Sequence, residues 1–291
     1  MLFKLINAKI IDKVNGIIST GKESNVYHGI GSNFEKKIDT GEIAIKIFKT
    51  AINEFKNRSS YVKGDYRFSD RLSKSNSHKT IQLWAEKELA NLNRIKKAGI
   101  LCPYTVMLKK HILVMEFLGS DGCASPTLRE ATHLNPTQLA RAAAQSVDIM
   151  KELYFKCDLI HADLSEYNLI WHTGSVYVID LGQAILRGHP FAFKFLLRDC
   201  NNISRFFLSR GLTEMKSGSE LFCEITGIDK SLVNCADDAE VLQKIQEIER
   251  DNRFFSKELN DNKKDEFDDV FNRSLTENNV NKMSIKNSCI E

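Results

Sequence analysis

The sequence has few prolines, no C-x-x-C pair and no long apolar run, and each absence excludes a class of protein. The seven cysteines are odd in number and lack metal-ligand spacing, which argues against a disulfide framework or a zinc site and favours free thiols in a reducing compartment. No apolar stretch approaches the roughly 20 residues needed to span a bilayer, and lysines interrupt the apolar residues at the N-terminus. We therefore expect a cytoplasmic protein without a secretory signal or a membrane segment.

The chain also lacks a strong net charge of either sign, since its net charge is only +3. The charged residues are, however, unevenly distributed along the sequence. Residues 45–100 carry thirteen Lys and Arg against five Asp and Glu, whereas residues 229–291 carry ten against fifteen. The basic block includes residues 57–79, which show little periodicity and predict a flexible insertion before a helix. This insertion either contacts RNA phosphates, releasing counterions, or is a solvated loop that maintains solubility. The residues alone favour the solvated loop.

The stretch His161-Ala-Asp-Leu-Ser-Glu-Tyr-Asn168, followed by Asp180, spaces three groups that phosphoryl-transfer chemistry uses. The carboxylate of Asp163 can accept a hydroxyl proton, while the Asn168 amide and the Asp180 carboxylate can hold Mg²⁺ on nucleotide phosphates. Alone, Asp163 or Asn168 could be an ordinary turn residue, and His161 is more typical of a structural imidazole. Together, with Asp180 opening Asp-Leu-Gly-Gln after a strand, they predict a phosphate-handling site with the spacing of protein kinases.

Alternating apolar residues predict a strand over residues 42–48, which places Lys46 where kinases carry a phosphate-pairing lysine. A lysine in an apolar strand needs a partner to offset its desolvation. The helix expected over residues 78–98 offers Glu86 and Glu88, which lie about 200° apart around the helix axis. Only Glu88 shares a face with the apolar residues at i+4 and i+7, so we choose Glu88 as the partner. The alternative is that both glutamates are solvated surface charges.

A strand, a turn and a second strand are expected at the start of the chain, where small residues let backbone N–H groups approach phosphate oxygens. The stretch Gly16-Ile-Ile-Ser-Thr-Gly21-Lys22 begins like a Walker A loop, but Glu23 stands where Mg²⁺ binding needs Ser or Thr. A strand-like run also follows, whereas a Walker loop opens a helix. The nucleotide contacts expected instead come from Ser19, Thr20, Gly21, Lys22, Glu23, Ser24, Asn25 and Val26.

Taken together, these stretches resemble the RIO family of atypical protein kinases, and specifically its type-1 branch. The likeness runs over roughly residues 15 to 215 and is carried by residues 19–26, 44–50, 61–68, 84–88, 161–168, 179–183 and 198–202. The type-2 branch is less similar, because it carries a winged-helix domain ahead of the phosphate loop and eighteen residues precede Ser19 here.

The resemblance implies that the chain binds ATP and Mg²⁺, with Mn²⁺ as an alternative ion. Lys46 matches the ATP-phosphate lysine of the family and Asp163 matches its proton acceptor. Asn168 and Asp180 match the two metal ligands, and in this family the residue at Asp180 can itself become an aspartyl-phosphate.

Family position also implies an adenine-binding hinge at residues 114–118, a short apolar strand that leads into Gly119. Met115 would be the gatekeeper beside the adenine. The backbones of Glu116 and Leu118 would contact the base.

Typical protein kinases close an activation segment with Ala-Pro-Glu, but none of the four prolines here precedes a glutamate. We therefore predict an α+β, bilobal protein-kinase-like fold that lacks a full activation segment and a peptide-docking subdomain. Its β-rich N-lobe would cover residues 1–115, and the hinge and helical C-lobe residues 116–255. Residues 256–291 would form a polar, acidic, flexible tail. Helices are expected in the C-lobe at residues 137–156, 191–210 and 236–255.

The function that the resemblance implies is an ATP- and Mg²⁺-dependent serine/threonine kinase, an ATPase, or both, acting in maturation of the small ribosomal subunit and its rRNA. The partners would then be ATP and the pre-ribosomal small subunit, whose rRNA would meet residues 57–79, in the cytoplasm with access to the nucleus. Two alternatives stay open: a ribosome assembly factor switched by nucleotide, and a small-molecule phosphotransferase of the antibiotic-kinase type. The latter needs an acidic substrate pocket that the sequence does not indicate. The sequence carries no signal for an oligomeric state.

Overall fold

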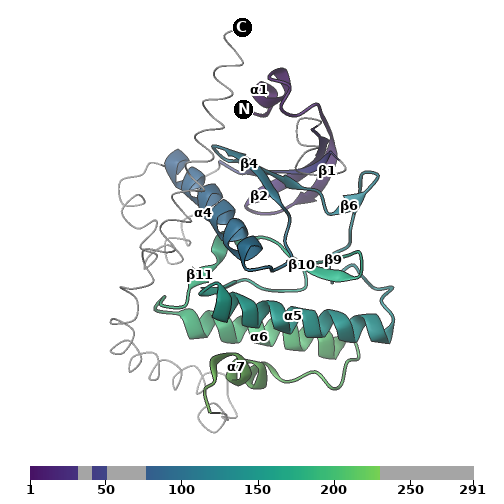
Figure 1. The fold of residues 1–291 in the computed structure, drawn as a ribbon, viewed down its shortest axis with the longest axis vertical. Helices are drawn as coiled ribbons and strands as arrows, with labels where there is room; N and C mark the ends of the chain where they lie inside the picture. Colours follow the sequence, from purple (N-terminus) through teal and green to yellow (C-terminus); the bar gives the residue numbers. More distant parts are fainter. Residues whose placement is uncertain (32–40, 51–76, 230–291) are drawn as a thin grey trace.

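A computed structural model describes residues 1–31, 41–50 and 77–229 of the chain. The N-terminal lobe contains α1 (Leu2–Asn7), β1 (Lys13–Thr20), β2 (Ser24–Ile30), β3 (Glu42–Phe48), α4 (Ser77–Lys97), β4 (Thr105–Lys109) and β5 (Ile112–Glu116). The C-terminal lobe contains β6 (Gly119–Ser120), β7 (Cys123–Ala124), α5 (Pro136–Lys156), β8 (Leu159–Ile160), β9 (Leu169–His172), β10 (Ser175–Val178), the 3-10 helix η3 (Leu181–Gln183), β11 (Ile185–Leu186), α6 (Ala192–Ser209) and α7 (Gly218–Thr226). Figure 1 shows the strands of the first lobe above and the helices α5 and α6 below, which is the expected bilobal α+β arrangement.

The five strands of the N-terminal lobe form one antiparallel sheet in the order β1-β2-β3-β5-β4. Side chains alternate between the two faces of a strand, and β3 follows this rule. Ile43 and Ile45 pack with Leu5 of α1 in a small apolar cluster on one face. Ala44 and Phe48 belong to the main core on the other face. Lys46 lies two residues from Ala44 and two from Phe48, so its side chain points to the same face of the sheet, toward the main core.

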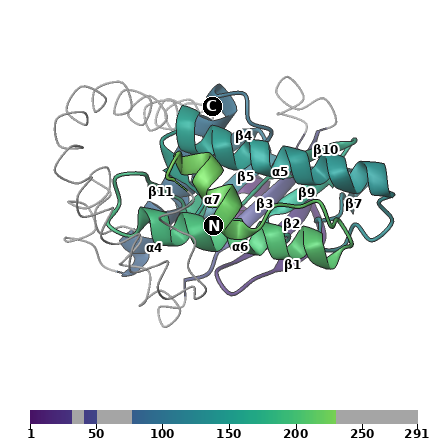
Figure 2. The same ribbon diagram turned by 90° about the horizontal axis from the view of Figure 1, so that it is seen from below.

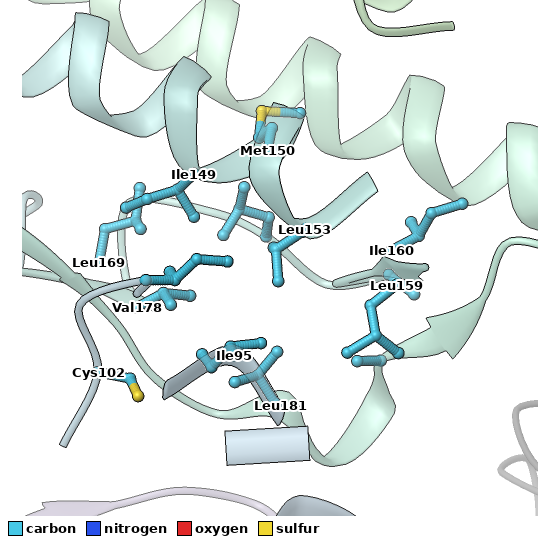
Figure 3. Packing of buried hydrophobic residues seen from close by; sticks show 14 of the residues in the cluster. Ile95, Cys102, Ile149, Met150, Leu153, Leu159, Ile160, Leu169, Val178 and Leu181 are labelled. Atoms are coloured by element: carbon cyan, nitrogen blue, oxygen red, sulfur yellow. The ribbon is translucent and has the colours of Figure 1, made fainter. Parts of the chain in front are cut away.

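The helix α4 forms where the apolar periodicity predicted it and ends in front of Gly99, whose φ of +85° is the left-handed conformation that glycine adopts easily. Its predicted inward positions are all buried, namely Ile81, Trp84, Leu89, Leu92 and Ile95. These buried residues lie along α4 from the sheet to the C-terminal lobe. Figure 3 shows Ile95 of α4 beside Leu181, with Cys102 close by and Leu153 of α5 above them.

The helical layer of the C-terminal lobe begins at α5, whose first turn has a complete capping box. Asn135 accepts a hydrogen bond from the backbone N–H of Gln138, and the Gln138 side chain accepts one from the Asn135 N–H, ahead of Pro136 at the first helical position. The helix α7 packs against both α5 and α6, as seen from below in Figure 2. Residues 181–191 alone connect Asp180 to α6, which leaves no room for a full activation segment.

Two helix predictions in the C-terminal lobe are confirmed, since α5 and α6 occupy the expected ranges within one residue. The helix predicted at residues 236–255, the acidic tail and the basic insertion up to residue 76 lie outside the described residues. Within the described ranges, no helix combines the length and the apolar character that crossing a bilayer requires. The five cysteines in those ranges are free thiols.

Candidate active site

The centre of the site is a three-residue ion-pair network around Lys46. Its Nζ donates to both carboxylate oxygens of Glu88, each at 2.7 Å, and to Oδ1 of Asp180 at 3.0 Å. These partners come from β3, α4 and the segment after β10. The pairing of Lys46 with Glu88 is the one that helix geometry favoured. Glu86 is half-buried on the same helix and is not a partner in this network.

Burial and charge act in opposite directions on this network. Burial alone would lower the pKa of the Lys46 ammonium, but the carboxylates of Asp180 and Glu88 outweigh it and raise that pKa well above its ordinary value. Burial raises the pKa of the Glu88 carboxyl to about 7, against the attraction of Lys46. The Asp180 side chain is 42% exposed, whereas that of Glu88 is 2% exposed. The network therefore has one outward-facing carboxylate, through which a ligand can reach it.

The loop that carries Asp163 begins directly after β8 and contains a strained residue. Ala162 has a φ of +62°, a left-handed conformation that costs energy for a residue with a Cβ. The Asp199 carboxylate on α6 accepts the N–H of Ala162 at 2.8 Å and that of Leu164 at 3.0 Å. Arg198 donates to the carbonyl of Ala162. These bonds fix the backbone on both sides of Asp163, whose own side chain is exposed.

A further hydrogen bond from α6 completes this support, because the Asn202 amide donates to the Leu164 carbonyl at 3.0 Å. Burial raises the pKa of Asp199 to about 8, although its two N–H donors and the Arg198 guanidinium favour the ionised form. Sequence reasoning noted the stretch Arg198–Asn202 only as part of the family likeness. The missed signal was an Arg-Asp pair and an Asn inside an apolar helix, since buried polar groups need partners.

Asn168 and Asp180 are brought to the same place by backbone contacts. The Asn168 amide donates to the carbonyl of Asp163 at 2.8 Å, and its own backbone carbonyl accepts the N–H of Ile179 at 3.0 Å. His161 is 2% exposed, and its Nε2 lies 3.0 Å from the Ile179 carbonyl, a donor contact. The histidine thus joins the loop of Asp163 to the segment of Asp180, which is the structural role expected of it.

The predicted phosphate-binding stretch forms a strand, a turn and a strand, as expected, and no helix follows it. The turn, residues 21–23, is closed by a 2.9 Å bond from the Gly21 N–H to the Ser24 carbonyl. A Cβ at Gly21 would lie 3.3 Å from that carbonyl oxygen, so a small residue is favoured there. Ser19, Thr20 and Lys22 are exposed, Ser24 is buried in β2, and Glu23, Asn25 and Val26 are half-buried.

The expected hinge follows the last residues of β5. Met115 is buried and pairs across the sheet with Ala44, on the same face as Lys46. Glu116 makes two bonds with Tyr104, donating its N–H to the carbonyl at 2.8 Å and accepting the Tyr104 N–H on Oε2 at 2.9 Å. The carbonyl of Leu118 accepts the N–H of Ser125 at 2.9 Å. The strand ends at Glu116, two residues earlier than the apolar run indicated.

Comparison with known proteins indicates the family to which the chain belongs. A family model described as "RIO domain" matches residues 25–219. The human serine/threonine-protein kinase RIO3 is 46% identical over 255 residues, which cover 85% of this chain and 49% of the relative. Human RIO1 is 41% identical over 248 residues, which cover 85% of this chain and 42% of the relative. The chain therefore spans about half the length of the curated relatives it matches.

Solved structures support the fold. A structure described as the Rio2 kinase-ADP/Mg2+-phosphoaspartate complex from Chaetomium thermophilum matches with a TM-score of 0.51 at 19% identity, covering 86% of this chain and 75% of that chain. At this identity the likeness is one of fold, and it agrees with the predicted protein-kinase-like architecture. Because the RIO-domain model also matches more than half of the sequence, the chain belongs to the RIO family, whose curated relatives are named serine/threonine-protein kinases.

Proposed function

We propose that this chain transfers the γ-phosphoryl group of ATP, as an atypical serine/threonine kinase, an ATPase, or both. The observation that carries the proposal is Lys46 held between Glu88 and Asp180, at 2.7 and 3.0 Å. All three N–H groups of this buried ammonium are engaged, so nucleotide phosphates would contact it in place of Asp180 while Glu88 keeps it fixed. The printed names of the relatives, serine/threonine-protein kinases, support the same reaction class.

The residues present fit ATP with Mg²⁺. Magnesium prefers one or two protein oxygen ligands together with substrate phosphates, and an amide oxygen and a carboxylate are donors of that kind. The Asn168 amide nitrogen is engaged with the Asp163 carbonyl, which turns its oxygen the other way. Asn168 and Asp180 would therefore hold the ion, and Lys46 would contact the phosphates. When bound, the ion would neutralise charge on the phosphate oxygens.

Asp163 is the group proposed to accept the proton of the attacking hydroxyl. Its carboxylate is exposed while its neighbours Ala162 and Leu164 are fixed to Asp199, so the base is accessible and its backbone is held in place. General-base function requires hydrogen-bond reach to the reacting proton, and this position would provide it.

An aspartyl-phosphate at Asp180 is the finer proposal. An oxygen of the Asp180 carboxylate would attack the γ-phosphorus, the bond to the β,γ-bridging oxygen would break, and ADP would leave with that electron pair. Water would then attack the phosphorus, Asp163 would take a water proton, and cleavage of the Asp180 O–P bond would release phosphate. The outward exposure of Asp180 supports this route, as does the word phosphoaspartate in the description of the Rio2 complex.

The proposed biological role is maturation of the small ribosomal subunit and its rRNA in the cytoplasm, with residues 57–79 as the RNA-contacting segment. The support is the family resemblance and the basic character of residues 45–100. Assignment to the type-1 branch stays a prediction, since human RIO3 shares 46% identity with this chain and human RIO1 shares 41%.

The test is ATP turnover by the purified protein with Mg²⁺, following phosphate on protein and in solution for wild type and Asp180→Ala. Free phosphate with a hydroxylamine-labile phosphoprotein, both lost in Asp180→Ala, would support the aspartyl-phosphate cycle. Acid-stable phosphoserine on an added protein, with little free phosphate, would support a conventional kinase. Tight ATP binding without turnover would contradict both and favour a nucleotide-switched assembly factor.

A further inference from the structure

A side-chain hydrogen bond joins the turn proposed to bind phosphate to the C-terminal lobe. Nε2 of Gln183 donates to Oε1 of Glu23 at 3.1 Å, across 160 residues of sequence. Both residues are half-buried. The Glu23 backbone is itself fixed to the N-terminal sheet, because its carbonyl accepts the N–H of Lys49 at 2.8 Å just after β3. The turn is therefore held by its main chain on one side and by Gln183 on the other.

Gln183 lies at the end of residues 180–183, a segment joined to the N-terminal lobe by three interactions. Asp180 pairs with Lys46, and the carbonyl of Leu181 accepts the amide of Asn91, which is fully buried on α4, at 2.9 Å. A Cβ on the next residue, Gly182, would lie 3.4 Å from Oε2 of Glu88. The hydrogen bond of Gln183 is the last of these three interactions along the segment, and it reaches the phosphate-binding turn.

We propose that Gln183 is a positioning residue that couples the turn at residues 21–23 to the placement of Asp180. This inference rests on the proposed function and names a residue that regulates the same site. The turn cannot move away from the phosphates without breaking the Glu23–Gln183 bond or shifting the segment that carries Asp180. Binding of phosphates under the turn and alignment of Asp180 are then one linked event.

The chemistry of residue 183 suits this role. A hydrogen bond to a carboxylate is stronger than one between neutral groups, so an amide donor gives Glu23 a firm partner. A glutamate at 183 would repel Glu23, and a lysine would add a cation three residues from Asp180, where it would compete with Mg²⁺. A neutral donor of this length satisfies Glu23 and leaves the charge balance around Asp180 unchanged.

The experiment is a double-mutant cycle on the full chain, with Gln183→Glu, Glu23→Gln and the exchanged pair carrying both changes. The exchanged pair restores a hydrogen bond with the donor on the turn and keeps the net charge of the wild type. Gln183→Asn, which shortens the side chain by one methylene, removes the contact without altering charge. Glu224→Gln on α7 changes charge as Glu23→Gln does, at a site that pairs with Lys151 and Lys216, and serves as the control.

Each single change at Glu23 or Gln183 is expected to weaken ATP binding and lower kcat by about tenfold, the usual loss for a hydrogen bond to a charged group. Adenosine binding should stay at the wild-type value, because the hinge is untouched. The exchanged pair should recover most of the loss. Single effects that simply multiply in the exchanged pair would overturn the coupling, because independent sites are additive in free energy.

A second measurement separates this inference from the proposed function. Hydrogen exchange at the backbone amides of residues 21–24 is expected to be faster in Gln183→Asn and to return toward wild type in the exchanged pair, with or without nucleotide. If the protein binds no ATP, the proposed function fails while exchange still tests the contact. Unchanged exchange in Gln183→Asn would overturn the inference even if ATP turnover is normal.

Discussion

Asp199 holds Asp163 in place through the backbone of its two neighbours. Its two carboxylate oxygens accept the backbone N–H groups on either side of Asp163, at 2.8 and 3.0 Å. One of these neighbours, Ala162, has a left-handed backbone at a φ of +62°. A conformation of this kind persists only where the surroundings fix it. The exposed position of Asp163 is thus a consequence of a buried acid on α6.

Asp199→Ala is expected to lower the free energy of unfolding by about 2 kcal/mol or more, since it leaves two buried N–H groups without an acceptor. Asp199→Asn should also be destabilising, because each oxygen of Asp199 accepts an N–H group, and the amide NH₂ of asparagine would face one of these donors. Urea denaturation measures the effect. Glu224→Ala removes an exposed acid in α7 that pairs with two lysines; it is the control and should change stability by about 1 kcal/mol at most. Equal stability of the Asp199 and Glu224 variants would contradict the role assigned to Asp199.

Glu88→Gln should lower ATP turnover by about tenfold or more, because Lys46 loses one of its two carboxylate partners and is no longer fixed for phosphate binding. The matched control is Glu86→Gln on the same helix, which removes the same charge outside the network. Steady-state kinetics on both variants decide the matter. If the two changes cost the same turnover, Glu88 has no special place in the site.

Protonation of His161 should lower the free energy of unfolding as the pH falls. Burial lowers the pKa of this imidazole below its ordinary value of 6.5, although the Ile179 carbonyl and the acids Asp180 and Asp163 partly oppose that shift and Lys46 adds to it. The unfolded chain therefore binds a proton near pH 6.5 that the folded chain refuses. The histidine's contribution is fully present above pH 6.5 and is lost as the pH falls toward the lowered pKa.

The measurement for His161 is the free energy of unfolding in urea at pH 7.5 and pH 5.5, for wild type and His161→Gln. Glutamine keeps a donor near Nε2 and does not titrate. Between pH 7.5 and pH 5.5, the free energy of unfolding of wild type should fall by up to about 1.4 kcal/mol more than that of the variant. This extra loss arises in the one pH unit below pH 6.5. Parallel losses in the two proteins would show that other groups cause the acid sensitivity.

The sequence predicted the contacts that follow from local geometry. Alternation in β3 placed Lys46 on the core face of the sheet, and the rotation of 100° per residue in α4 separated Glu88 from Glu86. A buried cation also requires a counter-charge, which predicts an acidic partner for Lys46. These arguments use short stretches of chain, and the structure has the expected pair at 2.7 Å.

The contacts that the sequence did not predict join distant stretches. Gln183 and Glu23 are 160 residues apart, and Asp199 lies 35 residues beyond Leu164. Periodicity fixes which face of an element is buried, but it does not say which element packs against that face. The buried Asp199 in an apolar helix did signal a missing partner, yet its partners are backbone N–H groups, which leave no trace in the amino-acid sequence.

Gly119, directly after the expected hinge, should not tolerate a side chain. A Cβ there would meet the backbone carbonyl of Cys123 and lie 2.5 Å from the Phe117 ring, whereas a Cβ at Gly16 would find nothing within 4 Å. Gly119→Ala is therefore expected to cost about 1–3 kcal/mol of unfolding free energy, the range for overpacking, and Gly16→Ala about 0.5 kcal/mol at most.

Because a backbone carbonyl cannot rotate away, relief of the clash must displace the β6–β7 hairpin and with it Leu118. Calorimetric binding should then show weaker adenosine affinity in Gly119→Ala but not in Gly16→Ala. Wild-type adenosine affinity in Gly119→Ala would show that Leu118 does not contact the base.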